Sequence, residues 1–288
     1  MMSNVVTCEK TKDQVIFMLN NYWNGNYTDF LFPLPNFVHL ERKHLEIIKT
    51  GEYVCTIKNI NHKRAVFMLY KNHEDINKQY LIFRDNTVIE TSIKFEDYFY
   101  KGSIFDVTYD SENIYIYDTY MIGGYIVNYC EYNVRHDYAI SICKDMNITC
   151  CKKYNRVSEI TSMKDDEELY FVPNEKPLIS GLNYYSFRWR PTELIEIGLK
   201  VKENEENLDL YTTNFKTDKL FARISNDTQK IKNLEDYREG CIINFNIKNK
   251  EFEAESVQND QEYPTNIRQI EKIILVKNEN ITFLELSN

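Results

Sequence analysis

The sequence predicts an α+β protein in which a larger domain with antiparallel sheets is followed by a small β-barrel. Three observations predict this class. From Tyr53 onward, short runs rich in β-branched and aromatic residues follow one another, with turn residues between them. Segments with helical spacing stand before these runs and near the C-terminus. After Pro191 the composition shifts to a charged stretch and then to a second series of short strands.

The first elements alternate between helix and extended chain. Residues 11–23 have the spacing of a short amphipathic helix, and residues 32–40 are extended and interrupted by prolines. A second helix over residues 41–50 ends at Gly51. The strands expected next, with hairpin turns at 85–86 and 110–113, are residues 53–58, 64–70, 79–85, 86–92, 103–110 and 113–122.

The remaining chain contains a mixed region and a second group of strands. Residues 128–164 are expected to be helical in part, and residues 168–173 form a further strand. Beyond them the expected elements are strands 208–213, 219–224, 241–247 and 251–257, and a helix over 268–276. This order predicts a first domain over residues 1–197 and a barrel with a C-terminal helix over residues 198–288.

Composition excludes several classes of protein. The chain has 288 residues, of which 43% are hydrophobic, enough for a sizeable core and too many for a disordered chain. A net charge of -9 argues against a protein that coats duplex DNA, because such binding needs many cations. No apolar run approaches the roughly 20 residues of a membrane span. The seven cysteines are odd in number and form no C-x-x-C pair, which favours free thiols in the cytoplasm.

One strand–turn–strand segment carries the first family resemblance. The stretch from Pro35 to Arg64 resembles the opening of eukaryotic-type mRNA capping guanylyltransferases, whose signature K-x-D-G-x-R contains a lysine that bonds covalently to GMP. Lys58 stands where that lysine would be and Arg64 where the arginine would be. The segment between them is one residue longer than in the family and lacks the Asp-Gly pair. A nucleophilic lysine needs a partly desolvated pocket, so this changed turn bears directly on catalysis.

Three later stretches resemble further motifs of the same family in the same order. Residues 80–92 are similar to its next strand pair, and residues 103–124 to the pair that normally contains L-D-G-E. In the second of these Asp106 is kept, Val107 and Thr108 replace Gly-Glu, and Asp118 matches a later aspartate. The local sequence there also resembles that of the cap-binding domain of snurportin, which has this fold without catalysis. In residues 167–197, Glu167 takes an acidic position, while Arg188 and Arg190 replace two phosphate-binding lysines.

The last motif departs most from the family. Capping enzymes carry W-x-x-x-R-x-R-x-D-K-x-x-P-N in a barrel of the oligonucleotide-binding (OB) type, where its cations orient the triphosphate of GTP. In residues 252–265, Ser256, Gln258 and Gln261 replace both arginines and the lysine. Attack on GTP needs the pyrophosphate held in line with its charge neutralised. The resemblance therefore implies a nucleotidyltransferase domain of the mRNA guanylyltransferase or ATP-grasp-like ligase type, followed by an OB-like barrel, with catalysis lost.

A guanine-nucleotide pocket without catalysis suits the 7-methylguanosine cap of mRNA. The methylated base is cationic and stacks between aromatic rings, while basic groups hold the phosphates. The resemblance thus implies a non-enzymatic cap-binding protein, with no cofactor and no metal, that acts in translation initiation or mRNA handling and whose source is viral. Its partner would be the capped 5′ end of mRNA. The residues expected at the site are Lys58, Arg64, Asp106, Tyr115, Tyr117, Asp118, Tyr120, Glu167, Arg188, Trp189 and Arg190.

Two other functions remain open. The chain could be a divergent capping guanylyltransferase that uses Lys58, or a non-catalytic subunit of a capping complex. Simpler interpretations also stand beside individual residues. Tyr115 and Tyr117 alternate on a strand and could line a core, and Trp189 could be a core residue between two surface arginines.

Overall fold

The computed structural model describes residues 3–24, 34–143, 148–178, 181–205, 207–214, 217–224, 228–248, 251–258 and 264–287. Gln261 lies outside these ranges. The chain forms two compact units. The first contains residues 1–40, 44–189 and 287–288, and the second contains residues 41–43 and 190–286.

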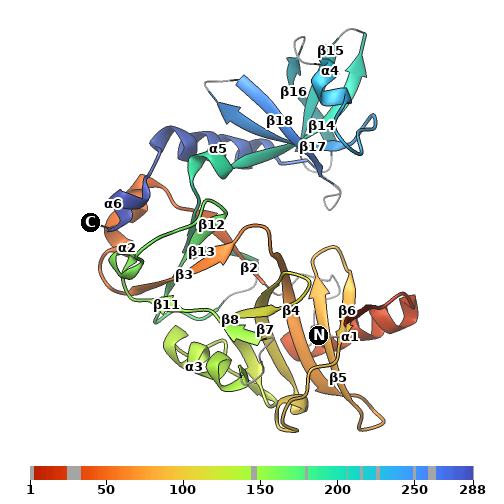
Figure 1. Ribbon diagram of the computed structural model, residues 1–288, viewed down its shortest axis with the longest axis vertical. Helices are drawn as coiled ribbons and strands as arrows, with labels where there is room; N and C mark the ends of the chain where they lie inside the picture. The colour runs from red at the N-terminus through yellow and green to blue at the C-terminus, as the bar shows by residue number, and fades with distance from the viewer. Residues whose placement is uncertain are drawn as a thin grey trace. The chain divides into compact units, whose positions relative to one another are not determined.

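The first unit is built on two sheets (Figure 1). The larger has the strand order β1-β6-β5-β4-β7-β8-β10, with β9 paired to β8. Its pairs are antiparallel, except that β10 runs parallel to β8. The strands are β1 (Ser3–Val5), β4 (Lys63–Lys71), β5 (Asn77–Phe83), β6 (Val88–Thr91), β7 (Ser103–Tyr109), β8 (Ile114–Ile122), β9 (Tyr125–Ile126) and β10 (Ile148–Cys150). The antiparallel strands expected between residues 53 and 122 are thus confirmed.

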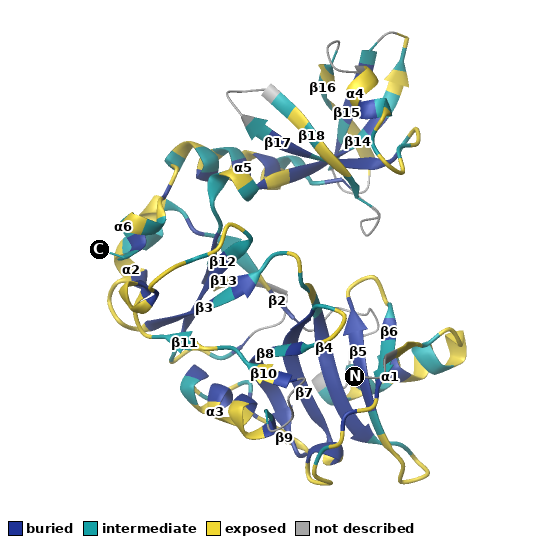
Figure 2. Cartoon of the chain, viewed as in Figure 1, coloured by how far each residue is buried: buried dark blue, intermediate teal, exposed yellow. Residues whose placement is uncertain are grey.

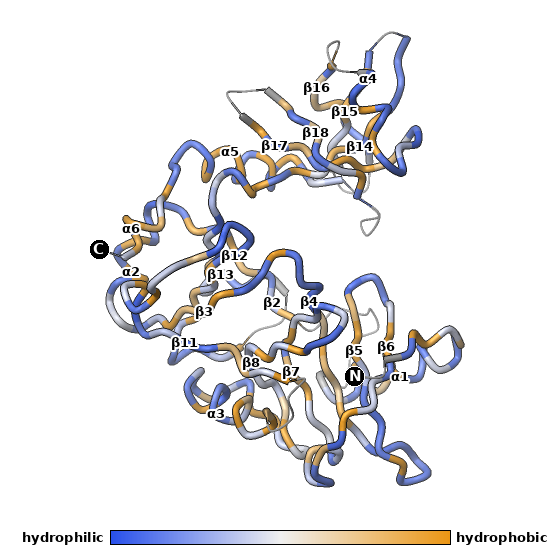
Figure 3. Tube along the Cα trace, in the orientation of Figure 1, coloured by the Kyte–Doolittle hydropathy of each residue, from blue (hydrophilic) through white to orange (hydrophobic). Residues whose placement is uncertain are grey.

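The larger sheet is buried on both faces, which explains why its strands are almost continuously apolar (Figures 2 and 3). On one face, Phe67 and Phe105 belong to a core that also takes in α3 (Tyr132–Ile142). On the other face, Val66 and Ile104 pack in a core with α1 (Glu9–Asn24). Alternation along β4 and β7 sends neighbouring residues to opposite cores.

The smaller sheet of this unit has the order β11-β3-β12-β13-β2. Its strands are β2 (Pro35–His39), β3 (Tyr53–Asn59), β11 (Lys153–Tyr154), β12 (Glu167–Pro173) and β13 (Gly181–Trp189). Only the pair of β2 and β13 is parallel among these described strands. The chain passes from this sheet to the larger one at residues 60–62, between β3 and β4. Side chains at the end of β3 and the start of β4 are therefore shared between the two sheets.

The second unit is one antiparallel sheet with helices, in the order β16-β15-β14-β17-β18. Its elements are β14 (Glu196–Asn204), β15 (Asn207–Asn214), β16 (Thr217–Ile224), α4 (Thr228–Lys232), β17 (Ile242–Lys248), β18 (Glu251–Gln258), α5 (Ile267–Glu279) and α6 (Phe283–Ser287). Among the described residues β16 and β18 have no pairing that closes the sheet, so the expected OB-like barrel is not confirmed. The expected C-terminal helix is confirmed as α5, which begins with a capping box of Asn266 and Gln269.

Short helices connect these elements. They are α2 (Leu45–Ile48) and four 3-10 turns at Arg42–His44, Phe99–Lys101, Val157–Glu159 and Thr192–Leu194. Within the described ranges, no helix is long and apolar enough to cross a membrane.

Candidate active site

Lys58 is the residue from which the site is built. It lies next to last in β3, and the turn after it is held by the Asn59 side chain. Asn59 Oδ1 accepts a hydrogen bond of 2.8 Å from the Asn61 backbone, and Asn59 Nδ2 donates one of 2.7 Å to Asp166. This turn is one residue longer than in the family signature and has no Gly, yet these bonds give it a defined shape.

The Lys58 side chain points into a closed, largely aromatic environment. The residue is only 3% exposed. Its ammonium nitrogen lies 4.0 Å from the Tyr117 ring centroid, 4.4 Å from that of Tyr170 and 5.8 Å from that of Phe37. These rings come from both sheets, since Tyr117 lies on β8 while Tyr170 and Phe37 lie on β12 and β2. Lys58 therefore lies where the two sheets of the first unit meet.

The carboxylate of Asp106 lies within ion-pair distance of Lys58, and Arg64 binds it more closely. Lys58 Nζ lies 3.7 Å from Asp106 Oδ2. Arg64 donates from Nε to Asp106 Oδ1 at 3.0 Å and from Nη2 to Oδ2 at 2.6 Å, and from Nη1 to the Pro35 carbonyl at 2.7 Å. The structure thus brings Lys58, Arg64, Asp106 and Tyr117 together, four of the residues expected from the sequence.

The environment changes the pKa values of these groups. Burial lowers the pKa of Lys58 to about 8, with Arg64 contributing in the same direction and Asp106 opposing it. Burial works against the charge of Asp106 as well, but Arg64 and Lys58 outweigh it and hold its pKa below the ordinary value. A lysine with a pKa near 8 is neutral in part at physiological pH, which is what nucleophilic attack by an amine requires.

A second carboxyl group near Lys58 comes from Glu168, which the sequence analysis missed. Glu168 lies directly opposite Lys58 in the β3–β12 register and is 4% exposed. The expected Glu167 lies opposite Asn59 instead and accepts a hydrogen bond of 2.9 Å from the Lys164 backbone. Two adjacent acidic residues in one strand face opposite ways, so a register error of one residue exchanges them.

The aromatic residues expected to stack on a base lie in different places. Tyr115 donates a hydrogen bond of 2.9 Å to Asp110, and its ring stacks on His62 with centroids 4.9 Å apart. Tyr120 is 1% exposed and belongs to the core beneath α1. Trp189 pairs with Leu169, one residue away from the Glu168 position, so it faces the side of the small sheet opposite Lys58.

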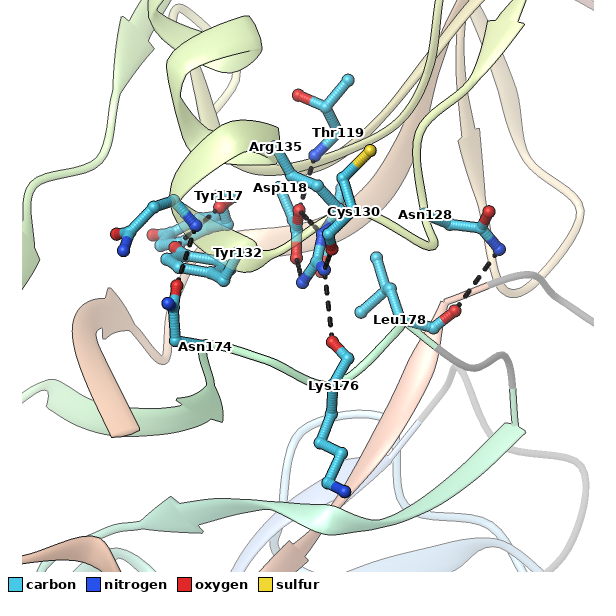
Figure 4. Close-up of polar contacts among 12 residues, drawn as sticks. Tyr117, Asp118, Thr119, Asn128, Cys130, Tyr132, Arg135, Asn174, Lys176 and Leu178 are labelled. Atoms are coloured by element: carbon cyan, nitrogen blue, oxygen red, sulfur yellow. Dashed lines mark hydrogen bonds and ion pairs between the residues drawn. The ribbon is translucent and has the colours of Figure 1, made fainter. Parts of the chain in front are cut away.

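Asp118, on β8, takes part in a buried hydrogen-bond network with residues of α3 (Figure 4). Arg135 donates to both of its carboxylate oxygens, from Nε at 2.9 Å and from Nη2 at 3.1 Å. The same guanidinium reaches the carbonyl groups of Cys130 and Lys176. Both charged side chains are fully enclosed, at 0% and 5% exposure. Asp118 is therefore committed to an internal ion pair.

The network of α3 also connects the two sheets. Tyr132 donates from its hydroxyl to the Tyr117 carbonyl at 3.1 Å and from its backbone to the Asn174 carbonyl at 2.8 Å (Figure 4). Tyr117 belongs to the larger sheet, while Asn174 directly follows β12 of the smaller one. These bonds fix the Tyr117 backbone beside Lys58.

The two arginines expected to bind phosphate belong to different compact units. Arg188 lies in the first unit and donates from Nη2 to His39 Nε2 at 2.7 Å, while its Nε is buried without a hydrogen bond. Its register with Tyr170 places it on the same face of the small sheet as Lys58. Arg190 belongs to the second unit, where it donates to the Leu194 carbonyl at 3.3 Å.

The last sequence motif, in which the cations of capping enzymes are replaced, lies in part on β18. Ser256 is exposed and Gln258 is partly buried, and neither brings a positive charge to this strand. In the part of the chain that the structure describes, no group of three or more His, Cys, Asp or Glu is arranged to hold a metal ion.

Comparison with known proteins gives a likeness of architecture only. No protein-family model and no curated protein sequence matches this chain. Among solved structures, it is similar to mycobacterial DNA ligase D complexed with ATP, at 7% identity and a TM-score of 0.43 over 82% of this chain and 97% of that one. The ATP-dependent DNA ligase of bacteriophage T7 gives 10% identity and a TM-score of 0.41 over 82% and 98%. A Lig E DNA ligase gives 10% and 0.36 over 77% and 99%.

These likenesses agree with the expected nucleotidyltransferase architecture at a coarse level. They show neither capped RNA nor a viral source. The prediction that the chain is not an enzyme is wrong: the three solved structures named above, which it resembles at a coarse level, are DNA ligases, which are enzymes. Although several motif residues are replaced, the fold encloses the Lys58 side chain almost completely.

Proposed function

We propose that the chain is a lysine-dependent nucleotidyltransferase. The neutral amine of Lys58 attacks the α-phosphorus of a nucleoside triphosphate. A P–N bond forms, the bond between the α-phosphorus and the bridging oxygen breaks, pyrophosphate leaves, and the amine releases one proton to solvent. The product is a covalent Lys58–nucleoside monophosphate, from which the nucleotide can pass to a second substrate.

The observation that carries this proposal is that Lys58 is buried, has no hydrogen-bond partner at Nζ, and has a lowered pKa. Moving a lysine ammonium out of water destabilises the folded state unless the charge is well paired. A lysine that has no function is therefore expected at the surface. Here the residue is 3% exposed, its ammonium nitrogen lies 3.7 Å from Asp106 Oδ2, and its pKa is lowered to about 8. Functional lysines that act as nucleophiles are typically found in such environments.

The donor and the acceptor follow from the sequence resemblance. The order of motifs around Lys58, Asp106 and Arg188 resembles that of capping guanylyltransferases, so GTP is the proposed donor. The proposed acceptor is the phosphorylated 5′ end of an RNA. The described cysteines are all free, which fits the reducing cytoplasm proposed as the site of action.

Binding of a methylated cap has no comparable support. The four aromatic residues expected for stacking are divided among a stacked pair with His62, the Lys58 environment, one core, and the opposite sheet face. The structure therefore offers no specific observation that favours a cap reader.

Incubation with GTP labelled at the α-phosphate and a magnesium salt tests the proposal. We expect a label that survives denaturation, is lost in acid as a phosphoramidate is, and is absent from Lys58→Arg, which keeps the charge but has no usable amine. Lys71→Arg, on the opposite end of β4 and paired with the exposed Asp75, is the matched control and should label normally. Labelling that persists in Lys58→Arg, or no labelling with GTP or ATP, would refute the proposal.

A further inference from the structure

The Arg64–Asp106 pair has a second consequence for Lys58. One buried carboxylate faces two cations, and they do not share it equally. Arg64 makes hydrogen bonds of 3.0 Å and 2.6 Å to its two oxygens, whereas the Lys58 nitrogen stays 3.7 Å from Oδ2. A charge-assisted hydrogen bond has a length of about 2.7–2.9 Å, so Lys58 has a charge nearby but no hydrogen bond to it. Lys58 Nζ is buried without any hydrogen bond.

Side-chain geometry explains why the arginine holds the carboxylate. The planar guanidinium matches both carboxylate oxygens at once, whereas an ammonium is a point charge. Arg64 is further fixed by its bond to the Pro35 carbonyl. It lies two residues before Val66, which is opposite Asp106, so Arg64 is on the same face of the sheet as that carboxylate. The guanidinium is thus held in place on β4 independently of Lys58.

We infer that Arg64 is a positioning residue that occupies both oxygens of Asp106 and thereby deprives Lys58 of a close counter-ion, which keeps the lysine amine available for attack. This role rests on the proposed function, in which Lys58 is the nucleophile. It assigns to Arg64 an effect on the nucleophile rather than on the substrate.

The other groups around Lys58 support this balance. Asp106 and Glu168 favour the ammonium form, as do the rings of Tyr117 and Tyr170 through cation–π contact. Burial raises the pKa of the Cys151 thiol to about 12, and burial also raises the pKa of both tyrosines, so these three groups are neutral near pH 7.

Burial and the Arg64 charge oppose the ammonium form. Arg64 is therefore the only cationic side chain, among those described as acting on Lys58, that works against protonation. Its removal frees Asp106 to bind Lys58 directly.

The test follows the ionisation of Lys58 without any nucleotide. Protein labelled with nitrogen-15 at the lysine Nζ is titrated by NMR, and the Lys58 signal is identified by its absence in Lys58→Met. In Arg64→Met we expect the pKa of Lys58 to rise by at least about one unit, since the freed carboxylate becomes its direct partner. In the double variant Arg64→Met/Asp106→Asn the pKa should fall back to the wild-type value or below it.

The double variant removes both members of the Arg64–Asp106 pair, so neither of these two groups is left buried without its partner. Arg223→Met is the matched control, because Arg223 binds Asp209 through Nε at 2.6 Å and Nη2 at 3.2 Å in the second unit. It should leave the Lys58 titration unchanged.

Three results would overturn the inference. An unchanged or lowered pKa of Lys58 in Arg64→Met would show that Arg64 does not deprive it of a counter-ion. A pKa that stays raised in the double variant would show that Arg64 does not act through Asp106. An equal shift in Arg223→Met would show a global effect.

A parallel measurement of covalent labelling separates this inference from the proposed function. The rate of labelling below pH 8 should fall about tenfold in Arg64→Met for each unit of pKa increase and recover at higher pH. The expected NMR shifts without any labelling of the wild type would refute the proposed function alone. Labelling of the wild type without the NMR shifts would refute the role of Arg64 alone.

Discussion

The pH dependence of covalent labelling follows directly from the burial of Lys58. Its pKa is lowered from 10.5 to about 8. At pH 7 about one molecule in ten then carries the neutral amine, compared with about one in 3,000 for an unperturbed lysine. The gain in reactive amine is therefore about 300-fold, equivalent to about 3 kcal/mol.

The assay is single-turnover labelling with a large excess of GTP, so that the observed rate reports the attack step. We expect the logarithm of the rate to rise with a slope of one up to about pH 8 and then to level off. Glu168→Gln should move this break to lower pH, because the Glu168 charge favours the ammonium form of Lys58. The nucleotide is titrated separately so that its own ionisation is not mistaken for that of Lys58.

A rate that keeps rising with a slope of one beyond about pH 9.5 would refute this reasoning, because it would mean that the amine ionises as an ordinary lysine does. A break moved to higher pH in Glu168→Gln would contradict the assigned direction of that charge.

Two further predictions concern the stability of the first unit. Lys58→Met should stabilise the protein below about pH 8 by about 3 kcal/mol, because the cost of burying the ammonium is present below the folded-state pKa and disappears as the pH approaches that of the unfolded lysine. Arg135→Met should cost about 3–5 kcal/mol in urea unfolding, since it leaves the Asp118 charge buried without its partner.

Each of these has a contradicting outcome. A loss of stability in Lys58→Met at pH 7 would mean that the lysine is well paired in the folded state. A change of less than about 1 kcal/mol in Arg135→Met would mean that the Asp118 network is not closed.

Strand patterns made most of the fold predictable. Alternating and continuous apolar runs identify β3 through β8, because the residues of each strand show how far it is buried. The same alternation puts Val66 and Phe67 in separate cores. Closure of the second sheet was not predictable in the same way. Whether β16 meets β18 depends on sheet twist and pairing at the edges, which no single strand specifies.

The site was predictable only for residues whose place in a sequence motif also determines their place in the folded sheets. Lys58 and Arg64 lie on either side of the turn between β3 and β4, and Asp106 lies on β7, which pairs with β4, so the order of the motifs along the chain was enough to predict that they meet. Asp118 was not, because its partner Arg135 lies on a helix and reaches it only in the folded chain.

Strand register also decided two positions on the small sheet. Its alternation separates Glu168 from Glu167, and likewise Arg188 from Trp189. A residue-by-residue match to a family motif does not contain that information.

The most direct test of the central claim is to locate the nucleotide on the chain. Protein incubated with GTP and magnesium is digested, and the peptides are sequenced by tandem mass spectrometry. We predict one modified peptide, containing β3, with a nucleoside monophosphate bonded to Lys58. A nucleotide bonded to any other residue, or no modified peptide under conditions in which the nucleotide is bound, would contradict the claim that Lys58 is the nucleophile.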